Sequence, residues 1–391
     1  MHKEFRILEV RRGHVLAQSL DAVKTEVLKI AGASKYIENE IIVAKPLSVG
    51  PDVPSRWEVI ASRVDPSFID GELPKLVSFG EEDDGIEFEF TRYVSYAEDA
   101  DFGDAMDALE SGDYDAAARL LRAFIRGFPF HIDSYHHLGI IETDLGHRHR
   151  ALKYFQMGYR IGLRSIPEFF VGSLPWSHLS NRPLLRAAHG YGLALEQDRR
   201  HLEAVDVYEQ VLAVNPNDNQ GIRYILPSLY LKAQAPQKAR AVLKQHGADG
   251  MNLYTQCLLE VQDGHLVEAV RWLCRGLSYN LHLPAMVLSG KMEPRSDEPR
   301  DVAMGGKYEA TQYLHMNDGW LRKESRDFLS RLMAAEPFVG RLDRAFEIQA
   351  VLDSRDSLPS GEVRSAKVDE FYAIFDEDHI PKILEECRNS L

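Results

Sequence analysis

The spacing of apolar residues changes twice along this chain and divides it into three zones. Between residues 5 and 64, short apolar runs alternate with polar residues, and glycines and prolines separate the runs at intervals of strand length. The apolar runs lie near residues 5–10, 15–16, 27–30, 41–43 and 57–60. Because alternation places every second side chain on one face of a strand, the pattern predicts a small, mainly antiparallel β domain over residues 1–64. We expect it to close into a barrel, since so few strands would otherwise leave their edges exposed.

The second zone, residues 65–104, is acidic and irregular. Its segment 81–85, Glu-Glu-Asp-Asp-Gly, predicts a turn or loop, and the alternation of Ile86, Phe88 and Phe90 with glutamates predicts one further strand. The acid cluster fits either a solvated linker or a calcium site. Because the alternating ligand spacing of a calcium loop is missing, we interpret this zone as an acidic linker.

From residue 105 onward the apolar period becomes helical, and a unit recurs after about 34 residues. Segments beginning at Gly112 and Gly146 each start with a glycine turn and continue with small and large apolar residues in the same order. Small residues let paired helices approach closely, while large ones fill the space between them. The small positions are Ala117, Gly139 and Ala151, and the large ones are Leu121, Phe124 and Phe155.

The same order returns three more times after an insertion. It lies over residues 192–216, 224–245 and 264–276, and of the five units in all, three match well and two match more weakly. This register is that of tetratricopeptide repeats, whose two-helix units must stack because one unit cannot bury its own apolar face. We therefore predict a mainly α fold: a right-handed, tetratricopeptide-like α-solenoid over residues 105–290, with an insertion at 164–183.

Two motifs extend this likeness to a particular group of proteins. Residues 181–190 (NRPLLRAAHG) and 215–221 (NPNDNQG) resemble a signature of bacterial tetratricopeptide proteins, and they are similar to the repeat region of the suppressor-of-tumorigenicity-7 family. The resemblance implies a solenoid preceded by a small β domain, but no general activity. Some bacterial members carry a cysteine-rich zinc tail that this sequence lacks, so no metal is implied. Helix punctuation also explains part of the motif, because Pro216 ends a helix and Asn217 or Asp218 can cap the next.

The insertion and the last hundred residues complete the predicted organisation. The insertion is either a lid over a binding site or an extended connection whose Phe169, Phe170 and Trp176 pack on the helices, and we favour the connection. Amphipathic segments over residues 291–352 predict a helical capping region, which a solenoid needs at its end. Residues 353–391 predict a linker followed by an acidic C-terminal helix.

Composition and motif content narrow the function classes. The formal net charge of -14 opposes non-specific attraction to nucleic-acid phosphates. The three cysteines are too far apart in sequence for a zinc ribbon or a disulfide framework, and no run of about 18 apolar residues is present. We therefore expect a cytoplasmic protein without a membrane span, metal or cofactor. The common phosphate-loop, dinucleotide, zinc-protease and hydrolase motifs are also missing, so we expect no enzymatic activity.

In tetratricopeptide arrays the first helix of each pair lines the concave face, and the register identifies ten candidate groove residues on these helices. The ten include aromatic, aliphatic and cationic side chains. Such a set suits a peptide, because apolar anchors supply binding energy and Arg186 can bind a carboxylate. The alternative is that about half of them are interhelical packing. The candidates are Phe102, Met106, His136, Ile140, Arg186, His189, Leu193, Tyr224, Tyr254 and Leu258.

Three functional hypotheses follow. The first is an adaptor or scaffold that holds a protein or peptide segment, of which an acidic segment is one candidate, in the groove of the solenoid. The second is RNA binding through the β domain and the basic first repeats, because residues 119–164 hold eight Lys/Arg against three Asp/Glu. The third is an enzyme that uses the insertion and the nearby His189. Oligomeric state and partner identity stay open.

Overall fold

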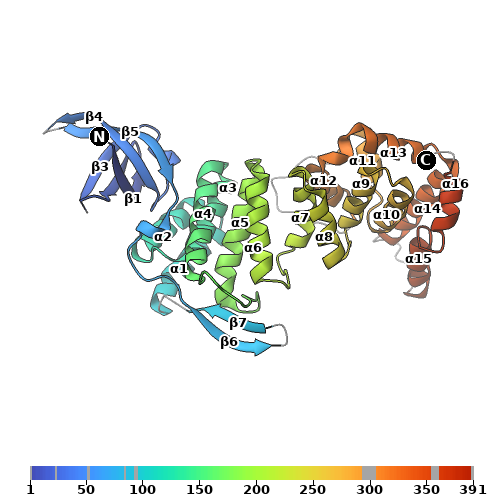
Figure 1. The fold of residues 1–391 in the computed structure, drawn as a ribbon, viewed down its shortest axis with the longest axis horizontal. Coiled ribbons are helices and arrows are strands. Elements are labelled where there is room, and N and C mark those ends of the chain that lie inside the picture. The colour runs from blue at the N-terminus through green and yellow to red at the C-terminus, as the bar shows by residue number, and fades with distance from the viewer. Residues whose placement is uncertain are drawn as a thin grey trace. The chain divides into compact units, whose positions relative to one another are not determined.

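The computed structural model describes residues 2–22, 24–50, 53–82, 85–91, 96–292, 305–353 and 361–388. The chain divides into two compact units, residues 1–220 (unit 1) and residues 221–391 (unit 2) (Figure 1). Unit 1 joins the predicted β domain, the acidic zone and the first half of the predicted solenoid. Each unit is described by itself below.

The N-terminal strands form a closed five-stranded barrel with the order β1-β2-β3-β5-β4. The strands are β1 (Lys3–Arg11), β2 (His14–Ser19), β3 (Thr25–Ile30), β4 (Ile41–Gly50) and β5 (Val53–Arg63). The β3–β5 pair is parallel and the other pairs are antiparallel. Phe5, Val15, Leu28 and Trp57 fill the interior, so alternation on each strand directs one face inward. The predicted small barrel is confirmed.

The acidic zone contains a second, two-stranded sheet made of β6 (Leu76–Glu82) and β7 (Gly85–Phe90). Strand β7 is the further strand predicted from alternation, whereas β6 was not predicted. The insertion pairs with β7, because Phe88 N donates to Ser173 O at 2.9 Å and Ser173 N donates to Ile86 O at 3.0 Å. Asn181 continues this contact by donating from Nδ2 to Phe88 O at 2.9 Å.

The aromatic residues of the insertion differ in packing and in exposure to solvent. Phe170 packs against Phe88, with ring centroids 5.0 Å apart, as expected of a connection that covers other elements. The Arg182 guanidinium lies over the Trp176 ring at 5.1 Å. Phe169, in contrast, is 88% exposed. The expectation that Phe169 packs on the helices is therefore wrong, because the turn after Pro167 directs its side chain to solvent.

Successive helices of unit 1 pack as pairs, α1 with α2, α3 with α4, and α5 with α6. Their bounds are α1 (Tyr96–Glu110), α2 (Tyr114–Gly127), α3 (Ile132–Asp144), α4 (Arg148–Ser165), α5 (Arg182–Gln197) and α6 (His201–Val214). The turns inside the first two pairs use Gly112 and Gly146, whose φ values of 79° and 76° lie in the left-handed region that glycine tolerates. The predicted helix pairs are therefore present.

The barrel is fixed to the helices of unit 1 by buried polar contacts from its β3–β4 connection. Tyr154 Oη of α4 donates to the buried Glu38 at 2.6 Å. Lys153 Nζ, also of α4, lies 2.7 Å from the buried Glu40. Breaking such buried pairs is costly, so the barrel and these helices form one body.

These contacts also account for most of the basic residues that suggested an RNA-binding surface. Five of the eight are engaged inside unit 1. Arg122 and Arg150 bind the buried Glu142, Lys153 binds Glu40, and Arg160 and Arg164 donate to the carbonyls of Val64 and Pro66. The local excess of positive charge therefore serves to attach the barrel and to neutralise buried carboxylates, and it does not support the nucleic-acid hypothesis.

Unit 2 is helical. Its helices are α7 (Ile222–Lys232), α8 (Pro236–His246), α9 (Asn252–Gln262), α10 (Leu266–Tyr279), α11 (Leu283–Ser289), α12 (Lys307–Met316), α13 (Lys323–Met333), α14 (Glu336–Asp353), α15 (Gly361–Ala373) and α16 (Ile380–Glu386). The pairs α7–α8 and α9–α10 correspond to the fourth and fifth predicted repeats. Trp320, Phe328 and Leu332, from the predicted capping region, share one core with α9 and α10. No helix in the described ranges is long and apolar enough to cross a membrane.

Candidate functional site

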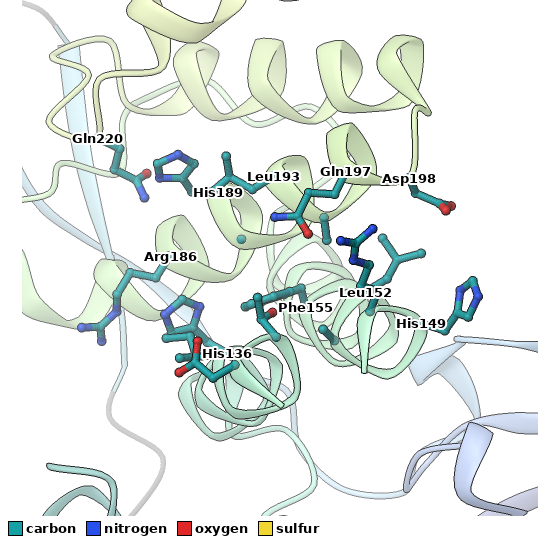
Figure 2. Close-up of a pocket in the computed structure, with 17 residues that line it drawn as sticks. His136, His149, Leu152, Phe155, Arg186, His189, Leu193, Gln197, Asp198 and Gln220 are labelled. Atoms are coloured by element: carbon teal, nitrogen blue, oxygen red, sulfur yellow. The ribbon is translucent and has the colours of Figure 1, made fainter. Parts of the chain in front are cut away.

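A pocket of about 570 Å³ opens between helices α3, α4 and α5 of unit 1 (Figure 2). Five of the ten predicted groove residues line it: His136, Ile140, Arg186, His189 and Leu193. Helical spacing explains their convergence, since residues three or four positions apart on one helix share a face. The spacing therefore brings together half of the predicted set, and the role of this half in peptide binding stays a prediction.

The floor of the pocket is apolar and rigidly packed. Phe155 of α4 lies between Gly139 of α3 and Gly190 of α5, and a Cβ atom added at either glycine would stand 2.6 Å from the phenyl ring. Both glycines are therefore needed for the helices to close on this ring. Leu193 stands at the pocket with 38% of its surface exposed, so the empty pocket leaves a large apolar side chain in contact with water.

One end of the pocket is polar. Figure 2 shows His136, Arg186, His189 and Gln220 grouped there, away from His149 and Asp198. Arg186 donates from Nη2 to Asp133 Oδ2 at 2.7 Å. Gln220 donates from Nε2 to the Leu185 carbonyl at 2.9 Å, which leaves its Oε1 atom as the acceptor available to other groups.

Burial keeps the two histidines of this polar end uncharged. It lowers the pKa of His136 to about 3, and the neighbouring charges of His137 and Arg186 act in the same direction. Burial also lowers the pKa of His189, although Asp218 opposes the shift. Neutral imidazoles therefore face the pocket at neutral pH, and each offers one hydrogen-bond donor and one acceptor.

Several buried polar atoms of this end have no hydrogen-bond partner within the residues that the structure describes. They are His136 Nδ1, His189 Nε2, Arg186 Nε and Gln220 Oε1. Buried polar groups in folded proteins are nearly always paired, and each unpaired one costs about 1–3 kcal/mol. Such a concentration around one pocket indicates a place where a bound group would supply the missing hydrogen bonds.

The opposite end of the pocket carries mixed charge. Figure 2 places Gln197, Asp198 and His149 there, and Asp144 and the exposed Arg148 complete the lining. Arg148 makes no ion pair with the described residues. Since Asp144 and Asp198 carry charge opposite to that of Arg148, this end holds no excess of positive charge.

The other predicted groove residues lie elsewhere. Phe102 and Met106 are half-buried on α1, where the Phe102 ring packs against Phe124 and His131 and is not part of the pocket. Tyr224 belongs to unit 2 and is 40% exposed; its hydroxyl donates to Asp249 at 3.1 Å.

Tyr254 and Leu258 correct the sequence prediction, because both are interior residues of unit 2. Tyr254 is fully buried and donates to the Asn280 carbonyl at 2.5 Å. Leu258 is 1% exposed and lies against Gly319. Helix α9 is covered by both α10 and α13, so the face assigned to the groove is closed by packing.

Sequence reasoning missed several residues that line the pocket. Leu152 and Arg148 come from the first turns of α4, the second helix of its pair, on which no groove residue was predicted. Gln197 could have been found, since it lies four residues beyond Leu193 on the stripe that includes Arg186 and His189. Gln220 could not, because its place depends on the fold of the loop after Pro216.

The histidines do not gather into a metal site within the described part of the chain, where no group of three or more His, Cys, Asp or Glu side chains could hold an ion. The His136 and His137 rings lie 5.2 Å apart at an interplanar angle of 70°. His147 is the N-cap residue of α4, and its Nδ1 atom lies 2.9 Å from Glu142 Oε2.

Comparisons with known proteins add little at the level of sequence: no family model and no curated protein matches this chain. Among solved structures it is similar to a tetratricopeptide repeat protein from Parabacteroides merdae ATCC 43184, with 14% identity and a TM-score of 0.40 over 75% of this chain and 100% of that chain. It is also similar to a chain in the structure of Naa15/Naa10 bound to HypK-THB, with 16% identity and a TM-score of 0.32. That likeness covers 74% of this chain and 41% of the other.

Proposed function

We propose that this chain is a protein-binding scaffold that holds a segment of another protein in the pocket between α3, α4 and α5. The observation that carries the proposal is one open pocket that combines an exposed apolar side chain, Leu193, with buried polar atoms that lack hydrogen-bond partners among the described residues. Concave sites with an apolar wall and a few convergent polar groups are the usual form of binding sites.

Size and rigidity support a peptide segment as the ligand. The volume of about 570 Å³ is that of a small-ligand site and accommodates a few residues of an extended chain. Because Phe155 is fixed between Gly139 and Gly190, the floor is formed before a ligand arrives, and less ordering entropy is lost on binding.

The proposal is one of binding without catalysis. A general acid or base works best when its pKa lies near the working pH. Burial lowers the pKa of His136 to about 3, and the pKa of His189 also lies below its usual value. These shifts favour a hydrogen-bonding role for both imidazoles, in a protein that we expect to be cytoplasmic.

Selection from a library of random twelve-residue peptides displayed on phage tests the proposal, using the full chain as bait. The variant Leu193→Glu places a charge at the apolar part of the pocket and should abolish recovery of the selected peptides. The matched control is Leu202→Glu on α6, since Leu202 is 67% exposed and does not line the pocket. If peptides bind both variants as well as the original protein, the proposed pocket is not the binding site.

A further inference from the structure

We propose that the pocket recognises an uncharged ligand, an apolar side chain together with the amide groups beside it, and does not select acidic segments. This inference rests on the proposed function and names the chemical class of its ligand. It departs from the expectation that Arg186 receives a carboxylate.

The charges around the pocket oppose the selection of an anion. Two guanidinium groups line it, Arg148 and Arg186, and so do two carboxylates, Asp144 and Asp198. Asp133 of α3, which does not line the pocket, already pairs with Arg186 at a distance of 2.7 Å. An acidic segment would therefore gain no net attraction from these groups and would lose its own hydration.

The unpaired groups at the polar end require both hydrogen-bond donors and hydrogen-bond acceptors from a ligand. Gln220 Oε1 can only accept, and Arg186 can only donate. A carboxylate offers acceptors alone and would leave Gln220 unpaired, whereas an ammonium group offers donors alone and would face the Arg186 guanidinium. An amide offers one N–H side and one C=O side, so it can satisfy both residues.

The two histidines fit the same chemistry. His136 is 9% exposed and faces His137 on its own helix, Arg186 and His189 on α5, and the Phe155 ring on α4. In this setting a second positive charge is disfavoured, so the imidazole stays neutral and can donate to or accept from an amide.

His189 has a comparable environment. It faces the Tyr208 ring of α6, with centroids 5.9 Å apart, and the carboxylate of Asp218. Its Nε2 atom is buried without a partner in the described chain, as is His136 Nδ1. Small rotations of these rings toward a bound amide would remove two of the unpaired groups.

The apolar floor supplies the second half of the recognition. Ile140, Leu152, Phe155 and Leu193 line the same pocket. Figure 2 shows Phe155 and Leu193 next to His136 and His189, so an apolar side chain can lie on them while its flanking amides reach the histidines. Covering the exposed part of Leu193 removes apolar surface from water and favours binding.

Fluorescence anisotropy with peptides selected on the full chain tests this inference. We expect their dissociation constants to change less than about twofold between 50 and 500 mM NaCl, because no net charge attraction is present to be screened. Replacing the apolar anchor by alanine should weaken binding at least about tenfold, and so should removing the amide that contacts the polar end.

Two peptide series identify where the amide comes from. N-methylation of each backbone amide in turn removes main-chain donors, and replacement of any Asn or Gln by Leu removes side-chain carboxamides. A large loss in either series supports the inference and identifies the source; no loss in both series overturns it. Enrichment of Asp or Glu among peptides that depend on Leu193, with affinity falling more than about tenfold over the same salt range, also overturns it but leaves the proposed function intact. If no selected peptide depends on Leu193, the proposed function itself fails.

Discussion

Replacing Gly190 by alanine should destabilise unit 1, although the same change in a free helix is stabilising. A Cβ atom at Gly190 would lie 2.6 Å from two carbons of the Phe155 ring, and Gly139 blocks the ring on its other side. Overpacking of this kind costs about 1–3 kcal/mol, and we expect the upper half of that range because the ring has no room to move. Alanine stabilises the helix by about 1 kcal/mol relative to glycine, which offsets part of this cost. The net loss should be about 1–2 kcal/mol.

Gly103 provides the matched control for this prediction. It also lies inside a helix of unit 1, but an added Cβ would meet no atom within 4 Å. Gly103→Ala should therefore stabilise the unit by up to about 1 kcal/mol. Urea unfolding measures the free energy of unfolding of both variants. Hydrogen exchange of peptides from α3–α5 then shows whether the change in stability lies in unit 1.

A double mutant tests the cause of the Gly190→Ala effect. Phe155→Leu removes the ring that the new methyl group would meet, so Gly190→Ala should cost less in that background by at least about 1 kcal/mol. If Gly190→Ala gains stability as Gly103→Ala does, or if the two substitutions are additive, the packing described for this floor is wrong.

Three further predictions concern buried charge. Glu142→Ala should destabilise unit 1 by about 3 kcal/mol or more, since it removes the carboxylate that lies 2.7 Å from Arg122 and 2.8 Å from Arg150. The control is Glu203→Gln at an exposed position, which should change the free energy of unfolding in urea by less than about 1 kcal/mol. Equal losses in the two variants would contradict the greater importance of the buried pair. Burial lowers the pKa of His131 to about 4 and that of His136 to about 3, so the folded state binds fewer protons than the unfolded state. Their contribution to stability is therefore full above pH 6.5 and is lost as pH falls, by about 2 kcal/mol per histidine between pH 6.5 and pH 5. His136→Gln should flatten this slope in denaturation curves measured across that range, and an unchanged slope would mean that His136 titrates normally. Finally, Arg186→Gln should cost more stability alone than in combination with Asp133→Asn, because the single change leaves a buried carboxylate unpaired; additive losses in the double-mutant cycle would refute the pairing.

The barrel and the helix pairs were predictable because each has a short-range signature. Alternation marked β1 to β5 and β7, and the glycines Gly112 and Gly146 marked the turns inside the first two helix pairs. Strand β6 was not predicted because Leu76 and Val77 are adjacent apolar residues and a bulge between Ser78 and Gly80 breaks the alternation.

The candidate site was predictable only where one helix carries the pattern. Arg186, His189 and Leu193 share a face of α5 whatever surrounds it. The exposure of a face depends on packing with distant elements, and here sequence reasoning failed for Tyr254 and Leu258, which α10 and α13 cover. The contribution of Gln220 depends on a loop. The use of the basic residues to hold the barrel depends on contacts about a hundred residues apart in sequence, as for Lys153 and Glu40.

In the function proposed here, a peptide segment lies against Leu193 in the pocket of unit 1. Photocrosslinking tests it directly, with p-benzoylphenylalanine placed at position 193 of the full chain and a selected peptide as partner. We expect a discrete adduct, with mass spectrometry mapping the attachment to the apolar anchor of the peptide, and no adduct from the same group at position 202. Equal crosslinking from both positions, or none from position 193 while the peptide stays bound, would contradict it.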